Sequence, residues 1–397
     1  DAMRISLVEQ GFSHRPEAGA PNRYIHEGAI FPAVILAPGT TTRVGIKVDS
    51  VADFMSAWQL GPDLAIAGSP GSQFRMAIVA DERDAALVVV ERHGFRGLAS
   101  PVVDPARNLH AALHAETFRR RPRSGQTDAS AFEATLALID ASIADIGQDW
   151  TCDLFFAAER EFWQRRNRAA RVQKQRQDVL GLGWANHDHH TYRSSRACFI
   201  PLIAVLERLG FVCRERFYAG AEAGWGAQVL EQPAAGITIF ADVDMSPEEL
   251  LGDFAHVALP ERKSLGTIGL WCGLHGEAML GAGMHHLECQ FDWHALKEQL
   301  EREASIRLMD PFTTFPFLRQ AFTEGERWAV DPARIDRLFV AGQITEEQAE
   351  SFRSAGAIGS HLENLERNDG FKGFNQMGVS EIIARTDPRK VASVAGA

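Results

Sequence analysis

The strongest constraint on the fold is a succession of expected elements that occurs twice after Trp184. The first pass starts at HHTYRSS, continues with the helix-like FIPLIAVLERLGF (199–211), and ends in strand-like CRERFYAG, WGAQVLEQP and GITIFADVD. The second starts at MHHLECQFD, continues with the helix-like WHALKEQLEREAS (293–305), and runs through QAFTEG and WAV to SHLENLER. Two such passes predict an α+β fold in which paired βαβββ modules form one cupped mixed sheet around a central site.

The residues before these passes predict an additional region. TTRVGIKV, FRMAIVAD and ALVVVERHG are strand-like, and DSVADFMSAWQ opens with a cap followed by helical spacing. We expect an N-terminal α/β region of unknown role over residues 1–115, and a linker with helices over 116–183. The first module, with a lid-like insertion, is expected over 184–284, and the second module with a closing segment over 285–397.

Two basic stretches precede the modules. ETFRRRPRSGQTDAS (116–130) is polar, with Pro and Gly, and predicts a linker. A helical stretch over 130–180 contains a basic run: Arg160, Arg165, Arg166, Arg168, Arg171, Lys174 and Arg176. Because the chain has a formal net charge of −11, we interpret the run as a solvated helix face, and we expect no nucleic-acid partner.

The compartment is predicted from cysteine usage and hydropathy. The five cysteines are scattered and form no C-x-x-C pair, which is typical of reduced thiols in a cytoplasm. No apolar run approaches the roughly 20 residues needed to span a bilayer, and no signal-peptide pattern is present. We therefore expect a cytoplasmic protein with no membrane partner, and homo-oligomer formation is left open.

Histidines and one glutamate supply candidate metal ligands. A redox iron site that is open to substrate and oxygen commonly takes two histidines and one carboxylate on one face. One histidine can come from DHHTYR, at the start of the first pass, and one from MHHLE, at the start of the second. Glu363 in GSHLENLER lies in a late strand of the second pass and completes the set.

Strand alternation limits which histidines can share a metal. Neighbouring residues point to opposite faces of a strand, so only one of His189 and His190 can face the central site. His187 would share the face of His189 if the strand began that early. In the second pass, His285 and His286 are alternatives in the same way.

Other interpretations of these polar residues are structural. Glu363 could instead pair with Arg367 on the same strand face. His256 and His275 lie in a Gly-containing region, 245–285, which could form a lid, although packing in the core or a loop is favoured.

Several motifs together indicate a family. D-H-H-T-Y-R-S resembles the D-H-x-A-F-R-T start of the 2-oxoadipate dioxygenase/decarboxylase (D-2-hydroxyglutarate synthase) family of the vicinal oxygen chelate superfamily. MHHLECQFDWHALKEQLE is similar to its N-H-x-T-x-R…D-I-x-x-L segment, and LRQAFTEG to its L-x-Q-x-S-T. GSHLENLER resembles P-G-S-Y-x-E-F-x-x-R, and FKGFNQMGVSEIIARTDP resembles the closing F-x-x-G-N-A-D-x-I-F-x-S-T. The five motifs occur in the family's order over about residues 184–389.

The resemblance implies a site. His189, His286 and Glu363 would be ligands of Fe(II). Arg193, on the face of His189, would hold a substrate carboxylate through its planar guanidinium and is the expected catalytic residue outside the ligand set. The other expected substrate-binding residues are Gln320, Val379 and Ser380.

The sequence also departs from the family pattern. Thr and Tyr replace Ala and Phe after the first ligand, Asn364 and Leu365 follow the glutamate, and MHHLE lacks the family's threonine and arginine. These departures leave the metal site intact but argue against assuming 2-oxoadipate itself as the substrate.

The resemblance therefore predicts a non-haem Fe(II)-dependent dioxygenase. It would act on a small-molecule 2-oxo acid and O2 by oxidative decarboxylation and intramolecular hydroxylation, as in the conversion of 2-oxoadipate to 2-hydroxyglutarate. One alternative is a metal-dependent isomerase of the glyoxalase or epimerase type. Another is a metal-free binding or regulatory protein with the same fold.

Overall fold

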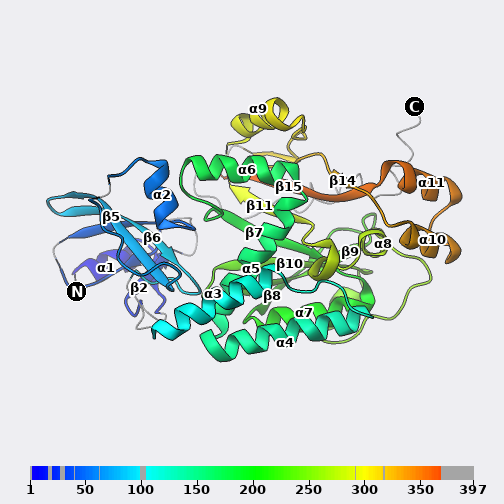
Figure 1. Cartoon of the computed structure of the whole chain (residues 1–397), viewed down its shortest axis with the longest axis horizontal. Helices are drawn as coiled ribbons and strands as arrows, with labels where there is room; N and C mark the ends of the chain where they lie inside the picture. Colours follow the sequence, from blue (N-terminus) through cyan, green and yellow to red (C-terminus); the bar gives the residue numbers. More distant parts are fainter. Residues whose placement is uncertain are drawn as a thin grey trace.

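The computed structural model describes residues 2–16, 20–26, 32–39, 41–61, 63–98, 104–290, 292–315 and 318–367. Val379 and Ser380, which the family resemblance places beside the substrate, lie outside the described residues. The N-terminal elements gather at one end of the molecule, beside the helices and the large sheet that follow them in the sequence (Figure 1).

Two small sheets make up much of the described N-terminal part. The elements are α1 (Ala2–Glu9), β1 (Phe12–His14), β2 (Arg23–His26), β3 (Val34–Ile35), β4 (Thr42–Lys47), α2 (Val51–Ala57), β5 (Phe74–Glu82) and β6 (Ala85–Arg92). The strands pair in the orders β1-β2-β3 and β4-β6-β5. Helix α2 begins where the Ser50 hydroxyl accepts a hydrogen bond from the backbone N–H of Asp53. It buries Val51 and Phe54 in a cluster with Val89 of β6.

A layer of helices follows, and single residues determine where some of these helices begin and end. Its members are α3 (Pro105–Arg119), α4 (Asp128–Ile146), α5 (Gln148–Arg165) and α6 (Arg168–Val179). Gly147 has φ of 84°, which suits glycine, so α4 ends and α5 begins within one residue. The Asn167 side chain accepts from Ala170 N and starts α6.

The linker predicted over 116–130 is shorter than expected and covers only residues 120–127. Residues 116–119 belong to α3 and residues 128–130 belong to α4. Between the two helices, Arg121 and Arg123 donate to the buried Glu159 of α5 through Nη2, at 3.0 and 2.6 Å. The segment resembles a linker in sequence because the glutamate that pairs with its charges comes more than thirty residues later.

A histidine joins the N-terminal sheet to α5. His93 follows β6, and its Nδ1 lies 2.6 Å from a carboxylate oxygen of Asp153, while its Nε2 lies 3.6 Å from Glu91. Burial alone would lower the pKa of His93, but the Asp153 and Glu91 carboxylates raise it to about 9. Burial alone would raise the pKa of Asp153, but His93 lowers it to about 2.

Stability should therefore depend on pH through this pair. Because the pKa of His93 is raised in the folded state, its stabilisation is complete below about pH 6.5 and is lost as pH rises through about 9. The contribution of Asp153 is present above its unfolded pKa near 3.8 and is lost as pH falls through about 2. We expect His93→Ala to lower the free energy of unfolding by about 1.5–3 kcal/mol at pH 6, and by progressively less as the pH rises from about 6.5 to about 9. Chemical denaturation of the parent protein and of His93→Ala at several pH values measures this difference.

A nine-stranded mixed sheet forms the centre of the structure. Its strands are β7 (His187–Arg193), β8 (Val212–Tyr218), β9 (Trp225–Gln232), β10 (Ile237–Asp244), β11 (His286–Gln290), β12 (Thr313–Phe315), β13 (Leu318–Phe322), β14 (Glu326–Trp328) and β15 (Ala357–Arg367). The helices between them are α7 (Phe199–Arg208), α8 (Thr267–His275), α9 (Trp293–Ala304), α10 (Pro332–Val340) and α11 (Glu346–Ala355). Single turns lie at η1 (Arg196–Cys198), η2 (Glu249–Leu251) and η3 (Ala278–Ala282).

The strand order contains two similar units. Along the sheet it is β12-β13-β15-β11-β7-β10-β9-β8, with β14 paired to β15. In each unit the first strand pairs in parallel with the last, β7 with β10 and β11 with β15. The two first strands, β7 and β11, pair antiparallel at the centre. This arrangement confirms the α+β fold class, with paired βαβββ modules in a cupped mixed sheet.

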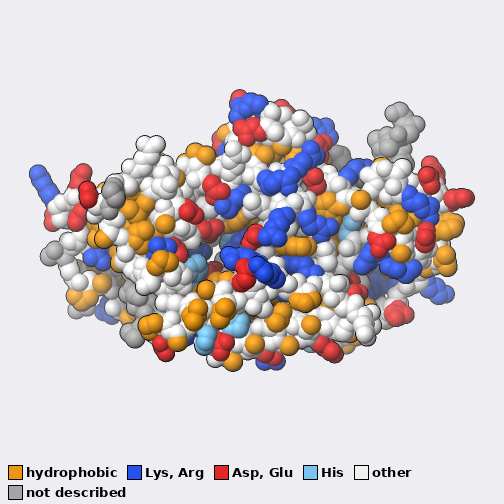
Figure 2. Space-filling view, in the orientation of Figure 1, with side chains coloured by type: hydrophobic (Ala, Val, Ile, Leu, Met, Phe, Trp, Pro, Cys, Tyr) orange, Lys and Arg blue, Asp and Glu red, His pale blue; other side chains and the backbone are white. Residues whose placement is uncertain are grey.

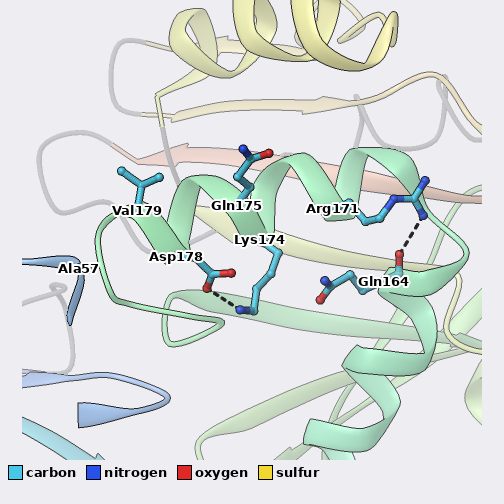
Figure 3. A pocket seen from close by; sticks show the side chains of 7 residues that line it. All are labelled: Ala57, Gln164, Arg171, Lys174, Gln175, Asp178 and Val179. Atoms are coloured by element: carbon cyan, nitrogen blue, oxygen red, sulfur yellow. Dashed lines mark hydrogen bonds and ion pairs between the residues drawn. The ribbon is translucent and has the colours of Figure 1, made fainter. Parts of the chain in front are cut away.

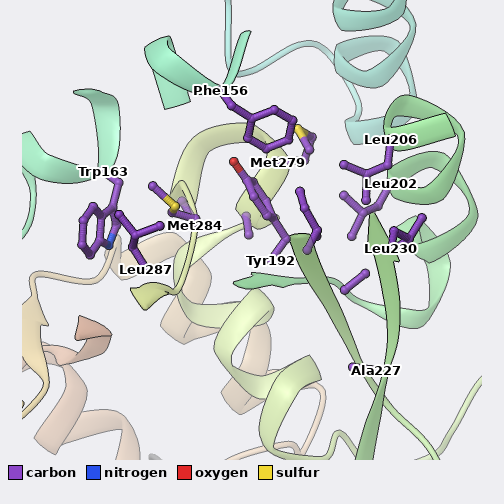
Figure 4. Close-up of a cluster of buried hydrophobic side chains, with 14 of the residues drawn as sticks. Phe156, Trp163, Tyr192, Leu202, Leu206, Ala227, Leu230, Met279, Met284 and Leu287 are labelled. Atoms are coloured by element: carbon purple, nitrogen blue, oxygen red, sulfur yellow. The ribbon is translucent and has the colours of Figure 1, made fainter. Parts of the chain in front are cut away.

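One face of the central sheet packs on the helical layer. The ring of Phe156 on α5 lies 5.5 Å from His190 and 6.1 Å from Tyr192, which both project from β7 toward the helix. Figure 4 shows Phe156 and Tyr192 within a buried cluster that also contains Leu202 and Leu206 of α7. Since α5 covers this face, residues that alternate with His190 point to the other side, into the cup.

Within the described residues, no helix combines the length and apolar character that a membrane span requires.

Candidate metal centre

The open side of the central strands brings together polar residues from four strands. His189 and Arg193 project from β7, on the opposite face from His190. Across the sheet, Thr191 pairs with His286 of β11, and Glu288 of β11 pairs with Glu363 of β15. On the other flank, Asp242 of β10 pairs with Arg193. The cup face therefore carries the carboxylates, imidazoles and guanidinium that the sequence placed on separate segments.

His189, His286 and Glu363 meet at the centre of this face. The two Nε2 atoms lie 3.3 Å apart. Oε2 of Glu363 lies 3.0 Å from His286 Nε2 and 3.5 Å from His189 Nε2. All three side chains are largely buried, with exposed fractions of 13%, 11% and 4%.

These separations match the spacing of ligand atoms around one metal ion. Metal–ligand bonds of about 2.1 Å place neighbouring ligand atoms about 3.0 Å apart on an octahedron and about 3.4 Å apart on a tetrahedron. Two of the observed distances, 3.0 and 3.3 Å, fall in this range, and the third, 3.5 Å, lies just above it. Two imidazoles and one carboxylate on a single face fit a divalent ion with further positions open to other ligands.

Glu288 orients His189. A carboxylate oxygen of Glu288 contacts Nδ1 of His189, which leaves Nε2 directed at His286 and Glu363. Burial raises the pKa of Glu288 to about 7, and the Glu288 and Glu363 carboxylates raise that of His189 to about 9 against the effect of burial. A carboxylate on the far nitrogen of a ligand histidine fixes its tautomer and strengthens it as a ligand.

We expect Glu288→Gln to weaken divalent-metal binding by about 10–100-fold, because the carboxylate that aligns His189 is lost while the ligand set remains. Titration of the metal-free protein with Co(II) or Zn(II) measures the change. Glu366→Gln is the matched control, since Glu366 is on β15 but pairs with Arg319. Equal affinities in the two variants would contradict the role of Glu288.

His286 has the protonation state that a ligand requires. Burial, with the nearby charges of His189 and Arg193, holds its pKa well below the usual value, so the imidazole is neutral. Its Nε2 also lies 2.9 Å from the hydroxyl of Thr191.

The two other described residues expected at the substrate are both buried. Arg193 is 4% exposed, and its guanidinium carbon lies 5.6 Å from the ring centre of Trp271. Asp242, beside it, has a pKa raised by burial to about 8, although the charge of Arg193 acts in the opposite direction. Gln320 on β13 pairs with Leu365, two residues from Glu363, and therefore shares its face of the sheet.

The expectation for His187 is wrong. Strand β7 does begin at His187, but its ring packs 4.9 Å from that of His190, on the other side from His189. The register explains this, because His190 pairs with Leu287 while His187 pairs with Cys289. The extra residue in β7 is a bulge, which shifts the alternation by one position.

The structure also shows the contacts of the three other histidines considered in the sequence. His285 places Nδ1 3.0 Å from the carbonyl oxygen of Gly359. His256 is half-exposed and pairs with Glu207 and Asp253. His275 packs against the rings of Trp271 and Trp328. The side chain of Arg367, the alternative partner of Glu363, lies outside the described residues.

Sequence reasoning missed two residues of this face. Glu288 follows His286 by two positions, so the pattern H-x-E already placed both on one face of a strand. Asp242 was also present in a segment assigned to a strand. What the sequence could not provide was the strand order that brings these residues together.

One surface hollow lies apart from this centre. A surface hollow of about 620 Å³ between α2 and α6 is lined by Ala57, Gln164, Arg171, Lys174, Gln175, Asp178 and Val179 (Figure 3). In it, Lys174 pairs with Asp178, and Arg171 donates to the carbonyl of Gln164. Neither the candidate ligands nor Arg193 lie in this hollow.

The basic run on α5 and α6 is only partly a solvated face. Figure 2 shows Lys and Arg side chains gathered over these helices. Arg165 pairs with Glu161, and Arg168 pairs with Glu326. Arg160 departs from the expectation, because it is buried, with Nη1 3.3 Å from His190.

Comparisons with known proteins identify no family. No family model matches the sequence, and a search of curated proteins gives no match. Among solved structures, the chain is similar to a glyoxalase superfamily protein from Ralstonia eutropha (11% identity, 68% of this chain and 97% of that chain, TM-score 0.35). It is also similar to a mutant 4-hydroxymandelate synthase from Streptomyces coelicolor (14%, 90% and 100%, TM-score 0.30). A third is methylmalonyl-CoA epimerase from Mycobacterium tuberculosis (14%, 46% and 88%, TM-score 0.25). At these values the similarities carry no argument about activity, and the function is argued from the site itself.

Proposed function

We propose that this chain is a mononuclear non-haem Fe(II)-dependent dioxygenase that acts on a 2-oxo acid. The observation that carries the proposal is the trio of His189 Nε2, His286 Nε2 and Glu363 Oε2, separated by 3.0–3.5 Å on one buried face. Two histidines and one carboxylate with open positions form the ligand set typical of such oxygenases. The sequence motifs around the same three residues support the same reaction class.

The proposed reaction consumes one O2 and releases one CO2. A 2-oxo acid loses its carboxylate as CO2, the former keto carbon becomes a carboxylate, and the adjacent carbon gains a hydroxyl group. A bound Fe(II) would supply the redox chemistry and the positions at which a 2-oxo acid and O2 meet. The three ligands would hold it, and Glu288 would keep His189 aligned.

Side chains around the trio suit a small acidic substrate. Arg193 lies four residues from His189 on one strand, a Cα separation of roughly 13 Å, so it would anchor a second carboxylate of a substrate bound at the metal. The rings of Phe240 and Phe322 lie 4.6 Å from His189 and 5.8 Å from His286, and would limit access of water to the reacting end. Gln320 of β13 would complete this wall.

A metal-dependent isomerase is the second candidate, and Asp242 favours it. Proton transfer next to a carbonyl requires a base whose pKa lies near the working pH, and the pKa of Asp242 is about 8. In that reaction the metal would stabilise an enediolate, and no O2 would be consumed.

The deciding experiment uses the full chain purified without oxygen. We expect about one iron per chain after loading with Fe(II), and O2 uptake matched by CO2 release with dicarboxylic or aromatic 2-oxo acids. Deuterium exchange into a carbonyl compound without O2 uptake would replace the proposal with the isomerase. Failure to bind Fe(II), Mn(II) or Co(II) would overturn both and leave a metal-free binding protein.

A further inference from the structure

Three imidazoles, those of His285, His286 and His361, form a second group. This group shares His286 with the trio of His189, His286 and Glu363. One nitrogen from each of His285, His286 and His361 lies within 4.8 Å of the other two. The ring centres are 4.6–5.5 Å apart, comparable with the 5.4 Å between His189 and His286. The rings of His286 and His361 stack, with 18° between their planes. His361 is 5% exposed and lies on β15, two residues before Glu363.

Each of these rings has a buried nitrogen that lacks a hydrogen-bond partner among the described residues. The atoms are Nε2 of His285, Nδ1 of His286 and Nε2 of His361. A buried polar atom without a partner costs about 1–3 kcal/mol, so three together indicate a ligand or a bridging group. A single chemical group that satisfies all three would remove that cost.

The hydrogen bonds of the other nitrogens indicate what kind of ligand fits. The carbonyl of Gly359 can only accept, so Nδ1 of His285 donates to it, and Nε2 of a neutral His285 presents a lone pair. Nε2 of His286 lies 3.0 Å from the Glu363 carboxylate; if it donates there, its Nδ1 also presents a lone pair. Lone pairs repel an anion and bind a metal ion. Neutral imidazoles suit Zn(II), Co(II), Ni(II) and Cu(II).

We propose that His285, His286 and His361 form an alternative divalent-metal position, back to back with the first across the His286 ring. One neutral ring cannot serve both positions, because the nitrogen that does not bind metal carries the proton. The two positions are therefore mutually exclusive, and one ion per chain is expected.

The second position should be the weaker one. It has no carboxylate, and the guanidinium charge of Arg193 acts on all three histidines. An ion should therefore use it mainly when the first trio is broken.

Co(II) titrations of the full chain, followed by visible absorption, test this inference. The inference rests on the proposed metal centre only because the two positions share His286. His189→Ala should keep one weaker Co(II) site, and the double variant with His361→Phe should lose that residual binding by a further tenfold or more. Phenylalanine retains the ring that packs between Phe322 and His286. His361→Phe alone should bind like the parent protein. Adding His275→Phe instead to His189→Ala is the control and should leave the residual site unchanged.

The outcomes separate the two claims. If His189→Ala and the double variant His189→Ala, His361→Phe bound Co(II) with equal affinity, the second position would be overturned. This holds whatever the Co(II) affinity of the parent protein is. Two ions per chain in the parent would also overturn it as stated, because the positions would not be exclusive. If the parent bound no more tightly than His189→Ala, the proposed function would fail while the second position stood. Thermal melting of each variant confirms folding.

Discussion

Replacing His189 with alanine is expected to weaken divalent-metal binding more than about 100-fold and to abolish any metal-dependent turnover. The Nε2 atom of His189 is one of three that meet within 3.5 Å, and its loss leaves one imidazole and one carboxylate on the first position. Loss of an outer partner of a ligand already costs about 10–100-fold, so loss of the ligand should cost more. Metal analysis after dialysis against a fixed concentration of free metal measures the effect.

His190→Ala is the matched control for this variant. His190 is the next residue on the same strand, but it points to the opposite face and packs on Phe156. Its loss should reduce stability through a cavity and leave the metal content unchanged. Equal loss of metal in the two variants would mean that the trio is not the metal centre.

Part of this site was predictable because its causes are local. The alternation of polar and buried residues along a strand placed His189 and Arg193 on one face, and the structure shows both there. The order of a strand, a helix and further strands occurs twice in the sequence, and it predicted the α+β fold class. Helices α7 and α9 were predicted from apolar residues three and four positions apart.

Other features depend on contacts that are distant in sequence. The bulge that turns His187 away from the cup arises from pairing with β11, almost a hundred residues later. Arg121 and Arg123 resemble linker residues until Glu159 is placed beside them. Helices α10 and α11 were not anticipated, although Asp331 and Thr345 cap their first turns, so a local signal was available.

Glu159 is expected to be the most costly single charge to remove for stability. Its side chain is 1% exposed and pairs with Arg121, which is fully buried, and with Arg123. Burial alone would raise the pKa of Glu159, but the two guanidinium groups hold it below the usual value, so it stays charged. The hydroxyl of Tyr192 donates to the same carboxylate at 3.3 Å.

The two arginines also connect this charge to the segment before His286, one of the candidate ligands. Arg121 donates to the carbonyl of Met279, and Arg123 donates to that of Leu280 at 3.2 Å. Both carbonyls belong to η3, the turn that precedes His286. Glu159 therefore neutralises the charges that attach α5 and the α3–α4 connection to this turn.

We expect Glu159→Gln to lower the free energy of unfolding by about 3–5 kcal/mol, because two buried guanidinium groups lose their counter-charge. Glu161→Gln is the control on the same helix. Glu161 pairs with Arg119 and Arg165, but all three are half-exposed, so its loss should cost about 0–1 kcal/mol. Urea denaturation of both variants, with unchanged slopes, measures the difference. Similar losses in the two variants would show that the buried cluster contributes no more than a surface ion pair, since burial is what distinguishes the two glutamates.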